Sequence, residues 1–105
     1  MSVFRDWTQR KDIEAFAGAL AKDLGRRFPP DSEARTDKGA KNQLKAITDT
    51  LFDQAVRFRR EKKLGVYGKA KLGNTFRWQL KEIGYSEPFV EETTHQLVGR
   101  LARNV

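Results

Sequence analysis

Residues 40–63 read AKNQLKAITDTLFDQAVRFRREKK, and this stretch carries the clearest structural pattern in the chain. Its apolar residues recur at intervals of three or four positions: Leu44, Ile47, Leu51, Ala55 and Phe58. That spacing places them on one stripe of an α-helix. Phe52 and Val56 widen the stripe on one side, so we expect this helix to contact two neighbouring helices.

The same period recurs in three other segments of the chain. One covers about residues 7–24, another ends at Ile83, and the last covers about residues 87–102. No segment shows the strict alternation of apolar and polar residues that is typical of a strand, and no internal repeat is present. The sequence therefore predicts an all-α protein, a compact four-helix domain over residues 1–105.

Glycine and serine residues suggest where these helices end. Gly25 and Gly84 stand where a helix commonly finishes in a left-handed residue, and Ser86 is a good N-cap for the last helix. Within the third periodic segment, Gly73 and Asn74 either lie inside one long helix or mark a break that Asn74 caps. We favour the break.

Residues 26–39 lack periodicity, and their two prolines exclude a continuing helix. We predict one long, flexible loop here between helices 1 and 2, with Phe28 anchoring one end to the core. The run Arg26–Pro30 also has the form of a short motif for a partner protein, but we favour a loop in which the prolines end the helix.

The composition excludes several classes of protein. The chain has 105 residues, enough for one core, and 38% of them are hydrophobic, which excludes wholesale disorder. It has no cysteine, so a disulfide framework and thiolate chemistry are excluded. No apolar run approaches the roughly 18 residues that a membrane span needs. We expect a soluble, cytoplasmic protein without a membrane span.

The positive charge is concentrated in one segment. The net charge is +7, and the window of residues 57–81 alone carries +8, with Glu61 as its single acidic residue. The other 80 residues together therefore carry −1. A concentrated basic segment favours an acidic partner such as nucleic acid.

We assign the candidate binding residues within this segment. When the third helix is projected at about 100° per residue, Trp78 lies among cations on the side away from the apolar stripe. There Trp78 would stack on a base, Asn74 would bond a base edge, and the cations would contact phosphates. The candidate residues are Arg59, Arg60, Lys62, Lys63, Lys69, Lys71, Asn74, Arg77, Trp78 and Lys81.

A purely structural interpretation explains the same residues. Cations suit the end of a helix because of its dipole, Arg57 follows Asp53 by four residues for an ion pair within the helix, and Trp78 would pack in the core.

Catalytic chemistry has little support in the sequence. The only histidine, His95, stands four residues after Glu91, and no further histidine or cysteine completes a metal site. The glycines fit no phosphate-binding loop, and the serines have no visible base. Asp49 and Asp53 are interpreted as solvated carboxylates and not as a catalytic pair. We expect no enzyme activity, no metal and no cofactor.

Two functions remain open. The first is a small basic accessory or regulatory protein that binds nucleic acid, DNA or RNA, through residues 57–81. The second is a protein-interaction module or small structural subunit that binds an acidic protein or a second copy of itself, as a homodimer. Composition and spacing do not choose between them.

Overall fold

The computed structural model describes residues 3–103. The regular structure within this range is helical and includes no strand, which confirms the predicted all-α class. The four α-helices and one short 3-10 helix are α1 (Val3–Arg27), η1 (Pro30–Ala34), α2 (Lys38–Lys62), α3 (Val66–Ile83) and α4 (Glu87–Ala102). None of these helices combines the length and the apolar character that crossing a bilayer requires.

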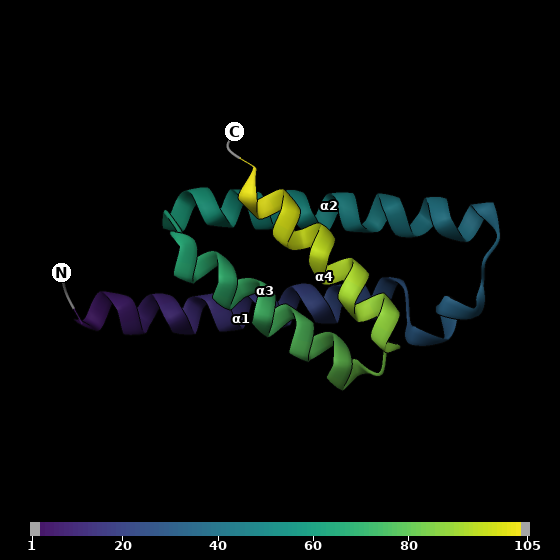
Figure 1. The fold of residues 1–105 in the computed structure, drawn as a ribbon, viewed down its shortest axis with the longest axis horizontal. Helices are drawn as coiled ribbons and strands as arrows, with labels where there is room; N and C mark the ends of the chain where they lie inside the picture. Colours follow the sequence, from purple (N-terminus) through teal and green to yellow (C-terminus); the bar gives the residue numbers. More distant parts are fainter. Residues whose placement is uncertain (1–2, 104–105) are drawn as a thin grey trace.

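The two long helices set the shape of the molecule. α1 and α2 run along its long axis in opposite directions, and α3 and α4 cross them obliquely (Figure 1). α1 packs chiefly on α3, while α4 lies between α3 and α2 and contacts both. The resulting body measures 50 × 29 × 19 Å.

One core joins all four helices, and the apolar stripes of the sequence form it. Its fully buried large side chains are Ile13 and Leu24 from α1, Leu51 from α2, Leu72, Phe76 and Leu80 from α3, and Val90, Leu97 and Leu101 from α4. Stacked rings of Phe16 and Phe58, with centroids 4.2 Å apart, join α1 to α2. The wide stripe of α2 is confirmed as a surface that contacts two helices.

The connection between α1 and α2 is shorter and more regular than a 14-residue loop. α1 continues through Arg27 and α2 begins at Lys38, so residues 28–37 make the link, and η1 occupies half of it. Phe28 is buried, as expected, and its carbonyl oxygen accepts a hydrogen bond from the Tyr85 hydroxyl. The turn is therefore fixed to the core at its first residue.

Two glycines predicted to end or interrupt helices lie inside them. Gly25 is within α1, where a Cβ would lie 3.3 Å from Ile83 Cγ2, and Gly73 is within an unbroken α3. Both positions were misassigned because a glycine also permits the close approach of a neighbouring element. The predicted break at Gly73–Asn74, with Asn74 as a cap, is therefore wrong.

The other helix ends agree with the sequence. Gly84 follows α3 with a φ of 114°, a left-handed conformation that glycine adopts without steric cost. Ser86 caps α4, because its hydroxyl oxygen accepts a hydrogen bond from the Phe89 N–H. Together they fix the three-residue link, residues 84–86, that positions α4 on α3.

Candidate functional site

The predicted binding residues occupy the last turns of α2, the short link to α3, and α3 itself. Trp78 is 54% exposed, so it is not a core residue. The Lys81 ammonium lies 5.2 Å from the centre of its ring, and the Arg77 guanidinium carbon lies 5.9 Å from it. Both distances are within the range of a cation–π contact.

A second aromatic side chain lies on the same side of α3. Tyr67 is 68% exposed, and the helical repeat places it with Asn74 and Trp78 on the face opposite the buried Phe76. The candidate residues predicted from the sequence do not include Tyr67, which lies in the first turn of α3.

Four of the candidate cations are already paired with carboxylates of neighbouring helices. The acidic partners come from α1 and α4, the two helices that pack against α3. The pairs are Lys62–Asp12 at 3.1 Å, Lys71–Glu14 at 2.9 Å, Arg77–Glu91 at 2.7 Å and Lys81–Glu87 at 3.9 Å. The charge of residues 57–81 is thus partly balanced by acidic residues that are distant in sequence.

The ion pair with Lys71 changes the environment of the Glu14 carboxylate. A hydrogen bond from Lys71, together with its charge, holds the pKa of Glu14 below its ordinary value. Because these pairs are exposed, they orient the side chains more than they stabilise the fold.

The remaining candidate cations gather near the end of α2. Arg60, Lys63 and Lys69 form no ion pair with any residue that the structure describes. Arg59 is half-buried, and its Nε has no hydrogen-bond partner within residues 3–103.

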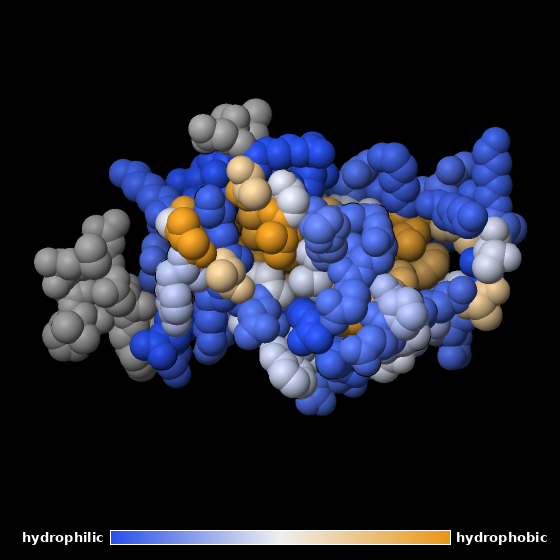
Figure 2. Space-filling model, in the orientation of Figure 1, coloured by the Kyte–Doolittle hydropathy of each residue, from blue (hydrophilic) through white to orange (hydrophobic). Residues whose placement is uncertain are grey.

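A hollow of about 480 Å³ opens between α2 and α4, and four arginines line it. Its lining residues are Asp53, Val56, Arg57 and Arg60 from α2, with Arg100 and Arg103 from the end of α4. In Figure 2, strongly hydrophilic residues lie along the upper edge of the molecule, over the C-terminal half of α2. Of these arginines, the sequence prediction included only Arg60.

Arg100 explains why one expectation about α2 was wrong. It hydrogen-bonds Asp53 and lies 3.8 Å from Asp49, whose other carboxylate oxygen accepts a hydrogen bond from Lys45, and both carboxylates are exposed, as predicted. Asp53 therefore does not form the predicted pair with Arg57. A contact between residues 47 positions apart left no periodic signal in the sequence that could have revealed it.

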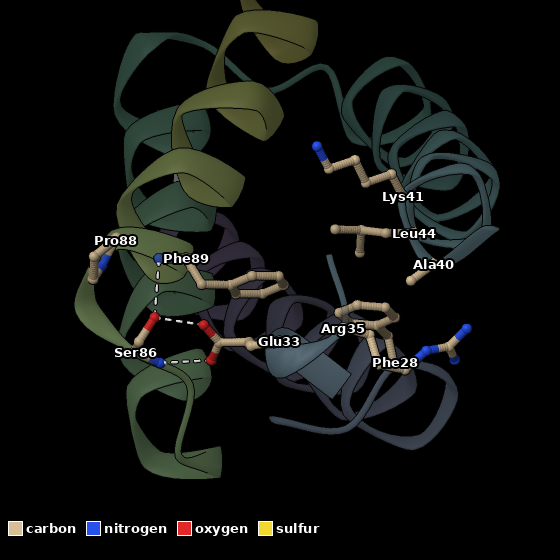
Figure 3. A pocket seen from close by; sticks show the side chains of 9 residues that line it. All are labelled: Phe28, Glu33, Arg35, Ala40, Lys41, Leu44, Ser86, Pro88 and Phe89. Carbon is tan, nitrogen blue, oxygen red and sulfur yellow. Dashed lines mark hydrogen bonds between the residues drawn. The ribbon is translucent and has the colours of Figure 1, made fainter. Parts of the chain in front are cut away.

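A smaller hollow of about 290 Å³ lies where the α1–α2 connection meets α4. Figure 3 shows Leu44 from α2 and Phe89 from α4 directed into it, with Phe28 below and Lys41 at its rim. One wall is fixed by Glu33 of η1, which accepts a hydrogen bond from the Ser86 N–H at 2.8 Å and another from the Ser86 hydroxyl (Figure 3).

The acidic side chains near His95 on α4 are bonded to other residues. Glu91 pairs with Arg77, and Glu92 accepts a hydrogen bond from Gln96, so neither is directed to His95. Within residues 3–103, no group of three or more histidine or carboxylate side chains is arranged to hold a metal ion.

Comparisons of the chain with protein-family models, with curated proteins and with solved structures found no match.

Proposed function

We propose that this protein is a non-enzymatic accessory or regulatory protein that binds nucleic acid through the outer face of α3 and the adjoining end of α2. The observation that supports this most directly is the exposed Trp78 ring between Arg77 and Lys81. Exposed aromatic rings beside cations are typical of surfaces that stack unpaired bases and hold the backbone. The proposal includes a cytoplasmic location.

The aromatic face has room for more than one base. Tyr67 and Trp78 are 11 residues apart in one helix, a separation of about 16 Å along its axis. Stacked bases follow one another at about 3.4 Å, so this length accommodates several nucleotides. Single-stranded nucleic acid is therefore the favoured partner.

Phosphate contacts would come from two kinds of cation. Lys63 and Lys69 have no carboxylate partner among residues 3–103 and are available directly. Lys71, Arg77 and Lys81 would exchange their carboxylates for phosphates. Because each such contact releases counterions, the affinity should fall steeply with salt.

Trp78 provides the sharpest test. Binding of a fluorescein-labelled 15-nucleotide poly(dT) or poly(U) strand at low salt should weaken about tenfold in Trp78→Ala. Trp78→Phe, which keeps an aromatic ring, should retain most of the affinity. If no strand binds, or if Trp78→Ala binds as tightly as the wild type, the proposal is wrong.

Charge reversal tests the phosphate contacts separately. Lys63→Glu with Lys69→Glu should weaken binding and make the salt dependence shallower, because fewer counterions are released. Lys38→Glu with Lys41→Glu makes the same charge change at the other end of α2 and serves as the control. Equal losses in both double variants would indicate a response to net charge alone.

A second candidate function is supported by exposed apolar side chains. Val66 is 83% exposed, and Val98 and the two exposed aromatic rings are also accessible. Figure 2 shows apolar areas over the start of α3 and over the C-terminal half of α4. Such side chains suit a protein partner or a second copy of this chain.

Sedimentation velocity at several concentrations tests self-association. A dimer that Val66→Asn dissociates, while nucleic acid leaves it unchanged, would favour the interaction module. A monomer at all concentrations would argue against the homodimer.

A further inference from the structure

We infer that the four-arginine hollow between α2 and α4 is a binding site for phosphate groups, distinct from the aromatic face of α3. Arg57 and Arg60 are three residues apart on α2, a spacing that places them on the same side of the helix. Arg100 lies in the last turn of α4, and Arg103 is the extended residue that follows this helix. Two pairs of guanidinium groups therefore line one hollow from two elements.

The acidic residues that line the hollow do not balance the charge of its four arginines. Asp53 is the only acidic lining residue, and it is hydrogen-bonded to Arg100. Arg57, Arg60 and Arg103 are exposed and form no ion pair with a residue in the described part of the chain. Like charges at such proximity repel one another, and a bound polyanion would remove that repulsion.

Fold stability does not account for all four arginines. Arg100 ties α4 to Asp49 and Asp53 of α2, which is a structural role. The last turns of α2 and α4 also attract cations through their unpaired carbonyl groups. That attraction suits Arg60, Arg100 and Arg103, which lie at helix ends, but it does not explain why Arg57 lines the same hollow.

The chemistry of the side chains specifies the ligand. A guanidinium group is a planar fork of donors that matches the oxygens of a phosphate, and several together favour a group with more than one negative charge. The half-buried Val56 supplies an apolar wall that reduces the competition from water. Pyrophosphate units and the phosphodiesters of a nucleic acid share this chemistry.

Inorganic pyrophosphate is the probe for the site, because it has no base to stack on Trp78. Isothermal titration at low salt should detect its binding to the wild type. Arg60→Gln with Arg103→Gln, which removes two exposed arginines without ion-pair partners in the described chain, should weaken that binding about tenfold or more. Lys38→Gln with Lys41→Gln removes the same charge from the other end of α2 and should leave the binding nearly unchanged.

Asp53→Asn should instead raise the affinity for pyrophosphate. It removes the carboxylate that competes for Arg100 while keeping an oxygen that still accepts a hydrogen bond, so pyrophosphate should bind several-fold more tightly. The inference is overturned if the wild type does not bind pyrophosphate, or if the two double variants lose affinity equally. It is also overturned if Asp53→Asn binds more weakly while retaining the wild-type melting temperature.

A competition experiment identifies the source of the phosphate. Displacement of pyrophosphate by poly(dT) would assign the hollow to a nucleic-acid backbone, and its failure would assign the hollow to a free polyphosphate. The experiment also separates this site from the proposed function. Loss of oligonucleotide binding in Trp78→Ala without any pyrophosphate binding refutes the arginine site alone, whereas pyrophosphate binding without oligonucleotide binding refutes the proposed function alone.

Discussion

Gly73 of α3 lies so close to Val98 of α4 that a Cβ at residue 73 would be only 2.8 Å from Val98 Cγ2. Glycine at this position therefore allows the two helices to cross closely, although it weakens the helix that contains it. The valine side chain has little freedom to move aside, because a β-branched residue in a helix strongly prefers one rotamer. The crossing depends on the absence of a side chain at residue 73.

Gly73→Ala should destabilise the protein although alanine favours helices. The added methyl group forces α3 and α4 apart, and overpacking of this kind typically costs about 1–3 kcal/mol. Urea unfolding followed by circular dichroism measures the change. Val98→Ala, introduced with Gly73→Ala, removes the clashing atom and should restore much of the loss.

Gly18→Ala is the matched control for this substitution. Gly18 lies within α1, and a Cβ there would have no heavy atom within 4 Å. The change should stabilise the protein by up to about 1 kcal/mol through helix propensity alone. If both glycine substitutions shift stability in the same direction, the close crossing does not set the role of Gly73.

Tyr85 should make stability fall in alkaline solution. Burial, with a further contribution from the Glu33 carboxylate, raises the pKa of its hydroxyl to about 12. The folded protein then keeps a proton that the unfolded chain releases near pH 10, so stability decreases as the pH rises from about 10 to 12. Tyr85→Phe should lack this part of the decrease, whereas Tyr67→Phe should keep it because Tyr85 is still present. Unfolding free energies measured between pH 8 and 12 decide the point.

Ser86 connects the start of α4 to η1, so its hydroxyl has two functions. It caps the helix by accepting from the Phe89 N–H, and it donates to Glu33. Ser86→Ala should cost about 1 kcal/mol, the usual value for a lost N-cap, and should increase hydrogen exchange in η1. Ser32→Ala is the control, because no hydrogen bond of that hydroxyl is found within residues 3–103. Equal stability of the two variants would contradict the prediction.

Lys71 should control the titration of Glu14. Its ammonium hydrogen-bonds the carboxylate and lowers the pKa of Glu14, so this pair stabilises the fold above the ordinary pKa of 4.5 and loses its effect as the pH falls through the lowered value. Lys71→Gln should raise the pKa of Glu14 toward that ordinary value in a carbon-13 NMR titration. Lys22→Gln removes a charge elsewhere and should not. An unchanged Glu14 titration in Lys71→Gln would refute the pair.

Much of the fold could be predicted because its signals are local. A stripe at the helical period forms the core in every helix, and Gly84 and Ser86 end and begin helices through their own backbone and side-chain chemistry. Gly25 and Gly73 could not be interpreted in the same way. Their role depends on Ile83 and Val98, which approach them from other parts of the chain.

The candidate site could be predicted only in part, for the same reason. Helical periodicity places Trp78 on the outer face of α3, and the structure finds it exposed there. The acidic partners of Lys71 and Arg77 belong to α1 and α4, and Arg100 meets Asp53 across 47 positions. The packing of the helices determines which charged side chains are left without an ion-pair partner. The periodicity of the sequence carries no information about that packing.

The carboxylates that pair with Lys71, Arg77 and Lys81 belong to the same molecule, so their local concentration around these cations does not depend on the concentration of the protein. An external anion must compete with them, and a single acidic group gains little by replacing one carboxylate with another. A polymer gains more, because it offers many closely spaced negative charges and holds them near once the first contact forms. This part of the surface should therefore select partners by valency and discriminate against small or isolated anions.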